Sequence, residues 1–165
     1  MTSSNSAPPA TSRAPGPTVD ISMRIAASPE IVYRYLSEPD RMALWLGPVV
    51  SMDARVGGKI QILMSGKHSG SGEILEIVAN RRLAYTWGWD EPNHPIPSGS
   101  TRIEVDLTPD GDGTIVRLQH LGLPADAVAD HNAGHSYFLE RLAIAATGGE
   151  LTPTSCDCPA CTSAS

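Results

Sequence analysis

Hydrophobic and polar residues alternate along several stretches of the chain with the period of two that half-buried strands adopt. The first stretch is 19–25 (VDISMRI), in which every second residue is apolar. The same pattern predicts strands over 58–64, 72–79, 81–89, 101–107 and 114–120, and we expect about six strands after the first. The turn at 109–113 (PDGDG) is the strongest hairpin signal, because aspartate and glycine favour tight turns between strands.

A period of three to four residues replaces this alternation in three places. Ser28 before Pro29 predicts a helix N-cap with proline in the first turn. Residues 41–46 (RMALWL) predict a second short helix that ends at Gly47. A long helix follows Pro124, and its expected inward face consists of Val128, His131, His135, Phe138, Leu142 and Ala146.

This order of elements predicts an α+β fold in which one curved antiparallel sheet wraps around the C-terminal helix. A sheet that curls needs a cover for its concave side, and only the last helix is long enough. Ser, Thr, Pro and Ala dominate both ends of the chain, so we expect a disordered tail over 1–17, one domain over 18–147 and a flexible tail over 148–165.

Composition narrows the classes of partner. The 165 residues carry 12 basic and 18 acidic side chains, which give a formal charge of -6 and predict no binding to nucleic acid or to membranes. No segment has the pattern of a signal peptide or the length of a membrane span, so we expect a cytoplasmic protein. All three cysteines (Cys156, Cys158 and Cys161) fall in the expected tail, where no disulfide can hold the core together.

Five segments, taken in order, resemble the SRPBCC or START-like (helix-grip, Bet v-like) superfamily, and in particular its activator of Hsp90 ATPase homologue-like (AHSA-like) family. They are ASPEIVYRYLSEPDRMALWLGP, VGGKIQI, SGEILEIVANRRLAYTWGW, DGDGTIVRLQHLGLP and DHNAGHSYFLERL. The resemblance implies the helix-grip fold with a cavity between sheet and helix, used for apolar or aromatic small molecules. The chain departs from the family where Leu46 and His135 stand, since tryptophan is common at both places.

The candidate ligand-binding residues are aromatic, histidine or methionine side chains on the expected inner surfaces. Tyr85, Trp87 and Trp89 share one face of a strand, where they could form either a cavity wall or ordinary core. Trp45 is a candidate for the cavity mouth or for a plug. The full predicted set is Trp45, Met64, Tyr85, Trp87, Trp89, His120, His131, His135 and Phe138.

Metal ligation is not expected, and neither is a cofactor. His131 and His135 lie one helical turn apart, but the segment HNAGH lacks the glutamate of a zinc protease and no carboxylate completes a site. The tail motif Cys156-x-Cys158-x2-Cys161 has three soft ligands, one short of a closed zinc site, so metal binding and a free oxidisable tail both stay open.

Three functions are consistent with this sequence. The preferred one is a binding protein, without catalysis, for a small apolar or aromatic ligand. The alternative is an enzyme of the cyclase or dehydratase kind, as in polyketide cyclase-like proteins, in which His120 or His135 moves protons. The third is a partner of a chaperone ATPase, which rests on the family resemblance alone. A homodimer is also left open.

Overall fold

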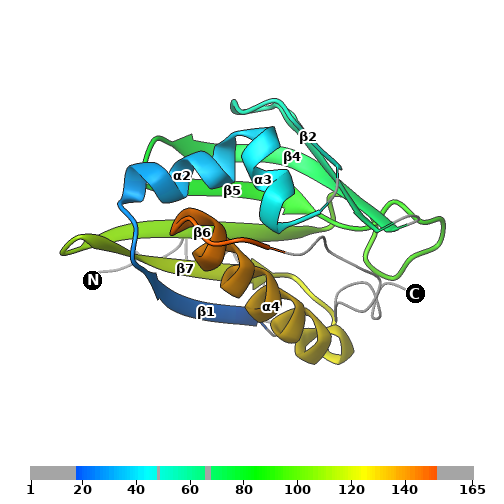
Figure 1. Ribbon diagram of the computed structural model, residues 1–165. Coiled ribbons are helices and arrows are strands. Elements are labelled where there is room, and N and C mark those ends of the chain that lie inside the picture. The colour runs from blue at the N-terminus through cyan, green and yellow to red at the C-terminus, as the bar shows by residue number, and fades with distance from the viewer. Residues whose placement is uncertain (1–17, 48, 66–67, 152–165) are drawn as a thin grey trace, which may run out of the picture.

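The computed structural model describes residues 18–47, 49–65 and 68–151 (Figure 1). Its strands are β1 (Thr18–Ile25), β2 (Val49–Met52), β3 (Lys59–Ser65), β4 (His68–Val78), β5 (Arg82–Trp87), β6 (Thr101–Asp110) and β7 (Gly113–Leu121). Its helices are α2 (Pro29–Ser37), α3 (Pro39–Trp45), the short 3-10 helix η2 (Ala125–Ala127) and α4 (Val128–Ala146). None of the helices in these ranges is long and apolar enough to cross a membrane.

The strands form one antiparallel sheet in the order β1-β7-β6-β5-β4-β3-β2. Strands β2 to β7 follow each other as a meander, and β1 pairs with β7, so the first strand lies beside the last. Helices α2 and α3 carry the chain from the β1 edge of the sheet to the β2 edge (Figure 1). The predicted α+β class and helix-grip fold are therefore confirmed.

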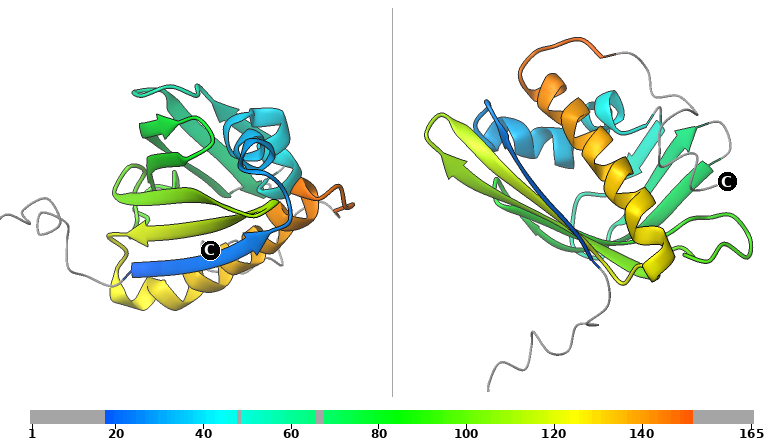
Figure 2. Two further views of the ribbon diagram at one scale, coloured as in Figure 1. Left: turned by 90° about the vertical axis from the view of Figure 1, so that its left-hand side faces the viewer. Right: turned by 90° about the horizontal axis from the view of Figure 1, so that it is seen from below.

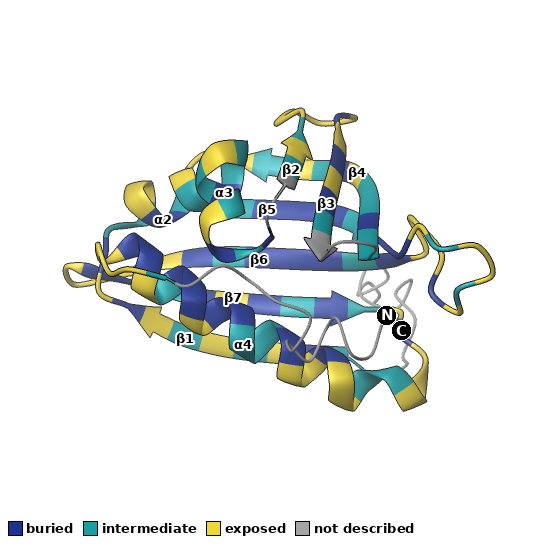
Figure 3. Ribbon diagram, turned by 45° about the vertical axis from the view of Figure 1, so that its right-hand side comes forward, coloured by how far each residue is buried: buried dark blue, intermediate teal, exposed yellow. Residues whose placement is uncertain are grey.

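Helix α4 crosses the concave side of the curved sheet, as the two turned views show (Figure 2). Its buried positions include His131, Phe138, Leu142 and Ala146, whereas the side that faces away from the sheet is exposed (Figure 3). Four of the six residues expected on the inward face are thus buried, and Val128 and His135 are partly exposed.

Local signals place the ends of the elements as expected. The Ser28 hydroxyl accepts a hydrogen bond from the Ile31 amide over 3.3 Å, so Ser28 caps α2, with Pro29 as the first helical residue. Between β6 and β7, Gly111 adopts a φ of +62°, which costs glycine little. The hairpin predicted at 109–113 forms there.

Three boundaries differ from the sequence-based prediction. No separate strand was recognised at Val49–Met52, because four residues are too few to show alternation. Strand β4 begins at His68, where a serine and glycine-rich turn was expected, because Ser69 and Gly70 pair with β3. Strand β5 ends at Trp87, and Trp89 makes only isolated bridges, to Gly70 and Pro97.

The outer face of the sheet carries a charged network instead of a second hydrophobic layer. Arg82 on β5 donates to both carboxylate oxygens of Asp106 on β6, at 2.7 and 2.9 Å, and reaches Glu104 at 3.2 Å. Glu104 is 2% exposed, and its neighbouring arginines hold the pKa of its carboxyl below the ordinary value against the effect of burial. Apolar ligands consequently have one candidate side of the sheet, the concave one.

Candidate functional site

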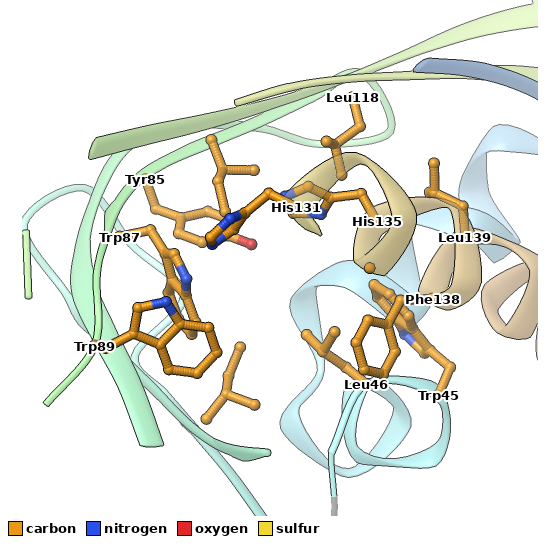
Figure 4. Close-up of a pocket in the computed structure, with 13 residues that line it drawn as sticks. Trp45, Leu46, Tyr85, Trp87, Trp89, Leu118, His131, His135, Phe138 and Leu139 are labelled. Atoms are coloured by element: carbon orange, nitrogen blue, oxygen red, sulfur yellow. The ribbon is translucent and has the colours of Figure 1, made fainter. Parts of the chain in front are cut away.

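A cavity lies between the concave face of the sheet, the C-terminal end of α3 and the middle of α4 (Figure 4). Nearly all of its lining is apolar, apart from the polar tips of Tyr85, Trp89 and two histidines. The lining residues are Trp45, Leu46, Ile62, Tyr85, Trp87, Trp89, Ile103, Leu118, His131, Gly134, His135, Phe138 and Leu139.

Three aromatic side chains form one wall of this cavity. Tyr85 and Trp87 meet edge to face with ring centroids 6.1 Å apart, and Trp87 and Trp89 do the same at 5.8 Å. The Trp87 ring passes over Gly70 on β4, where any Cβ atom would overlap the indole. Gly70 is therefore required for the position of this wall.

The loop after β5 fixes the last aromatic of the wall. The Trp89 amide donates to the Ile96 carbonyl over 2.8 Å, and Ile96 is itself buried. The Ile96 amide in turn donates to Nδ1 of His94 over 3.0 Å. These contacts hold Trp89, which is 3% exposed, over the cavity although the regular strand has already ended.

Helix α3 closes the opposite end of the cavity. Trp45 donates from its indole nitrogen to the Tyr35 carbonyl over 2.9 Å, which ties α3 to α2. Arg141 on α4 donates from Nε to the Trp45 carbonyl over 2.9 Å, which ties α3 to α4. Trp45 and Leu46 lie beside Phe138 in the close-up view, on the side opposite Trp87 and Trp89 (Figure 4).

Three histidines cluster where α4 meets β7. The ring centroids of His120 and His135 lie 5.1 Å apart, and those of His120 and His131 lie 5.4 Å apart. Nε2 of His120 is 2.8 Å from the Thr101 hydroxyl, which also lies 2.8 Å from the Trp87 carbonyl. Nδ1 of His120 is 2.9 Å from Nε2 of His135.

These contacts determine where the protons are when the imidazoles are neutral. The Trp87 carbonyl can only accept, so the Thr101 hydroxyl donates to it and accepts from Nε2–H of His120. Nδ1 of His120 is then an acceptor, and Nε2–H of His135 donates to it. Both ring nitrogens of His120 are consequently engaged inside the protein.

Burial keeps this cluster uncharged. Desolvation lowers the pKa of His120 well below its ordinary value and that of His135 to about 3, and the neighbouring imidazoles add to both effects. Burial also lowers the pKa of His131, although the Ala127 carbonyl and Asp130 act in the opposite direction. All three imidazoles are neutral at pH 7, which suits an apolar cavity.

The structure brings most of the predicted site residues together. Trp45, Tyr85, Trp87, Trp89, His131, His135 and Phe138 line the one cavity. His120 does not line it, since it is fully buried behind His135. Met64 belongs to β3, but its side chain is outside the described part of the structure.

Several lining residues escaped the sequence reasoning. Leu46, Ile62, Ile103, Leu118 and Leu139 have the same apolar character as the rest of the core, so no local signal distinguishes them. Gly134 could have been found from the helical spacing, because it precedes His135 and follows His131 by three residues.

Metal ligation finds no support within the described ranges, where no group of three or more His, Cys, Asp or Glu side chains could hold an ion. The histidine cluster also offers poor ligands, because His120 uses both ring nitrogens and His135 uses Nε2. Cys156, Cys158 and Cys161 lie outside the described residues, so their two interpretations stay open.

Comparison with solved structures identifies relatives over most of the chain. The solution structure of an AHSA1-like protein from Rhizobium etli is 33% identical, with a TM-score of 0.66, and the match covers 82% of this chain and 85% of that one. A protein from Mesorhizobium loti is 25% identical, with a TM-score of 0.73, over 82% and 100% of the two chains. The Aha1 dimer from Colwellia psychrerythraea is 23% identical, with a TM-score of 0.71, over the same shares.

Comparison with curated proteins gives no match. The sequence model of the family described as activator of Hsp90 ATPase homolog 1-like protein matches residues 26–147, from the end of β1 to the end of α4. That range includes every residue that lines the cavity. This chain therefore belongs to the activator of Hsp90 ATPase homolog 1-like family, within the SRPBCC superfamily.

Proposed function

We propose that this protein binds a small apolar or aromatic molecule in the cavity between the sheet, α3 and α4. The observation that carries the proposal is an apolar cavity whose wall is three aromatic rings in edge-to-face contact, Tyr85, Trp87 and Trp89. Ligand sites are typically apolar hollows with a few polar groups that fix orientation, and this cavity has that composition.

Binding of an aromatic molecule requires the cavity to widen. Its volume is about 60 Å³ in this structure, whereas an engineered apolar cavity that binds benzene measures about 150 Å³. The side chains at the α3 end, Leu46 and Phe138, are hydrocarbons, so they can rotate without breaking a hydrogen bond of their own. We infer that the ligand enters at this end and displaces them.

A screen of apolar and aromatic compounds tests the proposal. A ligand in the cavity should quench the fluorescence of Trp87 and Trp89 and raise the melting temperature, because it binds only the folded state. At one hundred times the dissociation constant, the free energy of unfolding should rise by about 2.7 kcal/mol. If no compound in a broad screen produces quenching or stabilisation, the proposal is wrong.

A pair of variants locates the binding event. Ile103→Phe places a larger ring in the cavity wall and should abolish binding, at a cost of about 1 to 3 kcal/mol in stability from overpacking. Val78→Ala is the control, because Val78 is 46% exposed and does not line the cavity. Equal binding by both variants would place the ligand elsewhere.

A second candidate function is proton transfer on a bound ligand. The sequence suggests His120 or His135 for this role, whereas the hydrogen bonds favour His131. Its Nδ1 lies 2.9 Å from the Ala127 carbonyl, and its Nε2 has no partner among the described residues. A neutral imidazole held in this way offers Nε2 as a general base. His131→Gln would then abolish turnover of a ligand that still binds. A binding protein without catalysis would show no turnover even in the wild type.

A homodimer also stays a prediction for this chain, since the solved Aha1 dimer from Colwellia psychrerythraea is evidence about that protein. Light scattering during gel filtration tests it directly. A mass near 17.4 kDa across the micromolar range would contradict a stable dimer of this chain. A role with a chaperone ATPase also stays a prediction, and it would need a docking surface for that partner.

A further inference from the structure

Two buried polar atoms of the cavity wall lack hydrogen-bond partners among the described residues. They are Nε1 of Trp89 and Nε2 of His131. Their side chains are 3% and 7% exposed, and both residues line the cavity. A third such atom, Oε1 of Glu91, belongs to a residue outside the cavity lining.

The two atoms have opposite hydrogen-bonding roles. An indole nitrogen can only donate. Nδ1 of His131 lies 2.9 Å from the Ala127 carbonyl, which can only accept, so Nδ1 carries the proton and Nε2 presents its lone pair. The wall of the cavity thus contains one unpaired donor and one unpaired acceptor.

These two rings lie close to each other. Their centroids are 6.5 Å apart with the planes inclined at 55°, so the two rings are neighbours in the cavity wall. The close-up view shows the His131 ring extending from α4 toward the indoles of Trp87 and Trp89 (Figure 4). Because both rings line the same cavity and are neighbours, we infer that a single ligand atom that both accepts and donates is the partner of both.

We propose that the ligand of this cavity carries a hydroxyl group, which accepts a hydrogen bond from Nε1–H of Trp89 and donates one to Nε2 of His131. This inference rests on the proposed binding function and narrows its ligand to a phenol or an alcohol with an apolar body. A hydroxyl is the smallest neutral group with both roles. A carboxylate could only accept and would face the lone pair of His131, and an ammonium group could not accept from Trp89.

The other polar groups of the cavity wall cannot account for a preference for ligands with a hydroxyl group. His135 directs Nε2–H at His120 and is not free to donate to a ligand from that atom. The hydroxyl of Tyr85 also reaches the cavity, but it can donate or accept, so it can add a contact without favouring one class of ligand. The preference for a hydroxyl therefore depends on Trp89 and His131, because a ligand without a hydroxyl that fills the cavity leaves both atoms unpaired.

Phenol, anisole and toluene form a matched set of probes for this inference. Phenol and toluene have nearly the same size and shape, so the cost of widening the cavity is similar for these two, whereas anisole is larger by one methyl group. We expect phenol to bind at least tenfold more tightly than toluene, with anisole between them because its oxygen can only accept. Isothermal titration or chemical-shift titration of the full chain at millimolar ligand gives the three dissociation constants.

Variants test whether Trp89 and His131 cause the preference for phenol over toluene. Trp89→Phe and His131→Phe should each reduce the preference for phenol over toluene about tenfold, because each removes one hydrogen bond of the hydroxyl. Tyr33→Phe is the control, since Tyr33 lies on α2 outside the cavity lining, and it should leave the preference unchanged. Retention of the full preference in both test variants would overturn the inference.

The wild-type protein provides a second readout that does not depend on the folding of variants. Phenol should shift the indole proton of Trp89 downfield and the Nε2 resonance of His131 in ¹⁵N spectra, whereas toluene should move neither in that direction. Equal affinities for phenol and toluene would overturn this inference and leave the proposed binding function intact. This result is also expected if Trp89 donates directly to His131 in solution. Absence of binding by every probe would count against both.

Discussion

Nε of Arg141 donates to the main-chain carbonyl of Trp45 over 2.9 Å, although the two residues stand 96 positions apart in the chain. A second nitrogen of the same guanidinium lies 3.3 Å from the Leu44 carbonyl. Arg141 is only 7% exposed, and the hydrogen-bond acceptors of its guanidinium within the described ranges are these two main-chain carbonyls. Its charge is instead directed at the C-terminal carbonyls of α3, which favour a cation.

We therefore expect Arg141→Met to loosen α3 from α4. The variant keeps an apolar stem but leaves the carbonyls of Trp45 and Leu44 without a donor, which should cost about 1 to 3 kcal/mol of unfolding free energy. Chemical denaturation measures the loss, and acrylamide quenching should show a more accessible Trp45. Arg141→Lys is the control and should lose less, because it retains a cation and a donor. A methionine variant as stable as the wild type would show that this contact contributes nothing.

The inward face of α4 gives a second prediction. Phe138 and Leu142 are 4% and 0% exposed, so Phe138→Ala and Leu142→Ala should each destabilise the protein by about 2 to 5 kcal/mol. Glu140 lies between them on the exposed face, and Glu140→Ala should change stability by less than about 0.5 kcal/mol. Chemical denaturation measures the three midpoints. Equal midpoints would contradict this assignment of the buried and exposed faces.

The sequence alone predicts those features that follow from local periodicity. The alternation over 101–107 and the DG turn after it are sufficient to place the β6–β7 hairpin, and the spacing of Phe138 and Leu142 defines the buried face of α4. The five segments that resemble the family placed these elements in one fold. Both kinds of signal are visible because each depends on residues close together in the chain.

Features that depend on contacts distant in sequence could not be predicted in this way. Arginine is usually a surface residue, so the sequence gives no sign that Arg141 is buried. The position of α3 makes it a buried hydrogen-bond donor. The engagement of both His120 nitrogens depends on Thr101 and His135, which come from different elements. Alternation also extended the β5 pattern to Trp89, although Gly88 takes the backbone out of the regular strand before it.

The histidine cluster predicts that the protein becomes less stable as the pH is lowered. The pKa of His120 and of His135 is lowered in the folded state, so the unfolded chain binds protons first as pH drops through its own value near 6.5. The stability contributed by each neutral histidine is fully present above that pH. Below it the free energy of unfolding should decrease by up to about 1.4 kcal/mol per pH unit for each, and for His135 this continues toward pH 3.

Urea denaturation between pH 7.5 and 5 measures this slope above the range where carboxylates protonate. His135→Gln removes one titrating group and should make the slope shallower by the amount assigned to one histidine. A free energy of unfolding that does not change over this interval would contradict the burial of neutral imidazoles described above.

The C-terminal boundary can be tested by two truncations. The Gly149 amide donates to the Ile144 carbonyl over 2.8 Å, and Leu151 is partly buried against the core. A chain that ends at Leu151 should keep the melting temperature, because residues 152–165 are mostly small and polar. A chain that ends at Thr147 should lose a few degrees, since it lacks these contacts. Zinc that stabilises only the full chain would indicate a metal site in the cysteine motif.

His135→Trp, which introduces the residue more common in the family, should close the cavity to ligands. An indole is larger than an imidazole, and the space it would enter measures only about 60 Å³. The substitution also removes the donor to Nδ1 of His120, so we expect a loss of about 1 to 3 kcal/mol in stability while the fold persists. His135→Gln is the matched control, because its amide nitrogen can take the place of Nε2 and its volume fills no additional space.

Thermal melts with and without a ligand from the screen separate the loss of binding from the loss of stability. Ligand stabilisation should disappear in the tryptophan variant and persist in the glutamine variant, and a tryptophan variant that binds as well as the wild type would place the ligand away from α4.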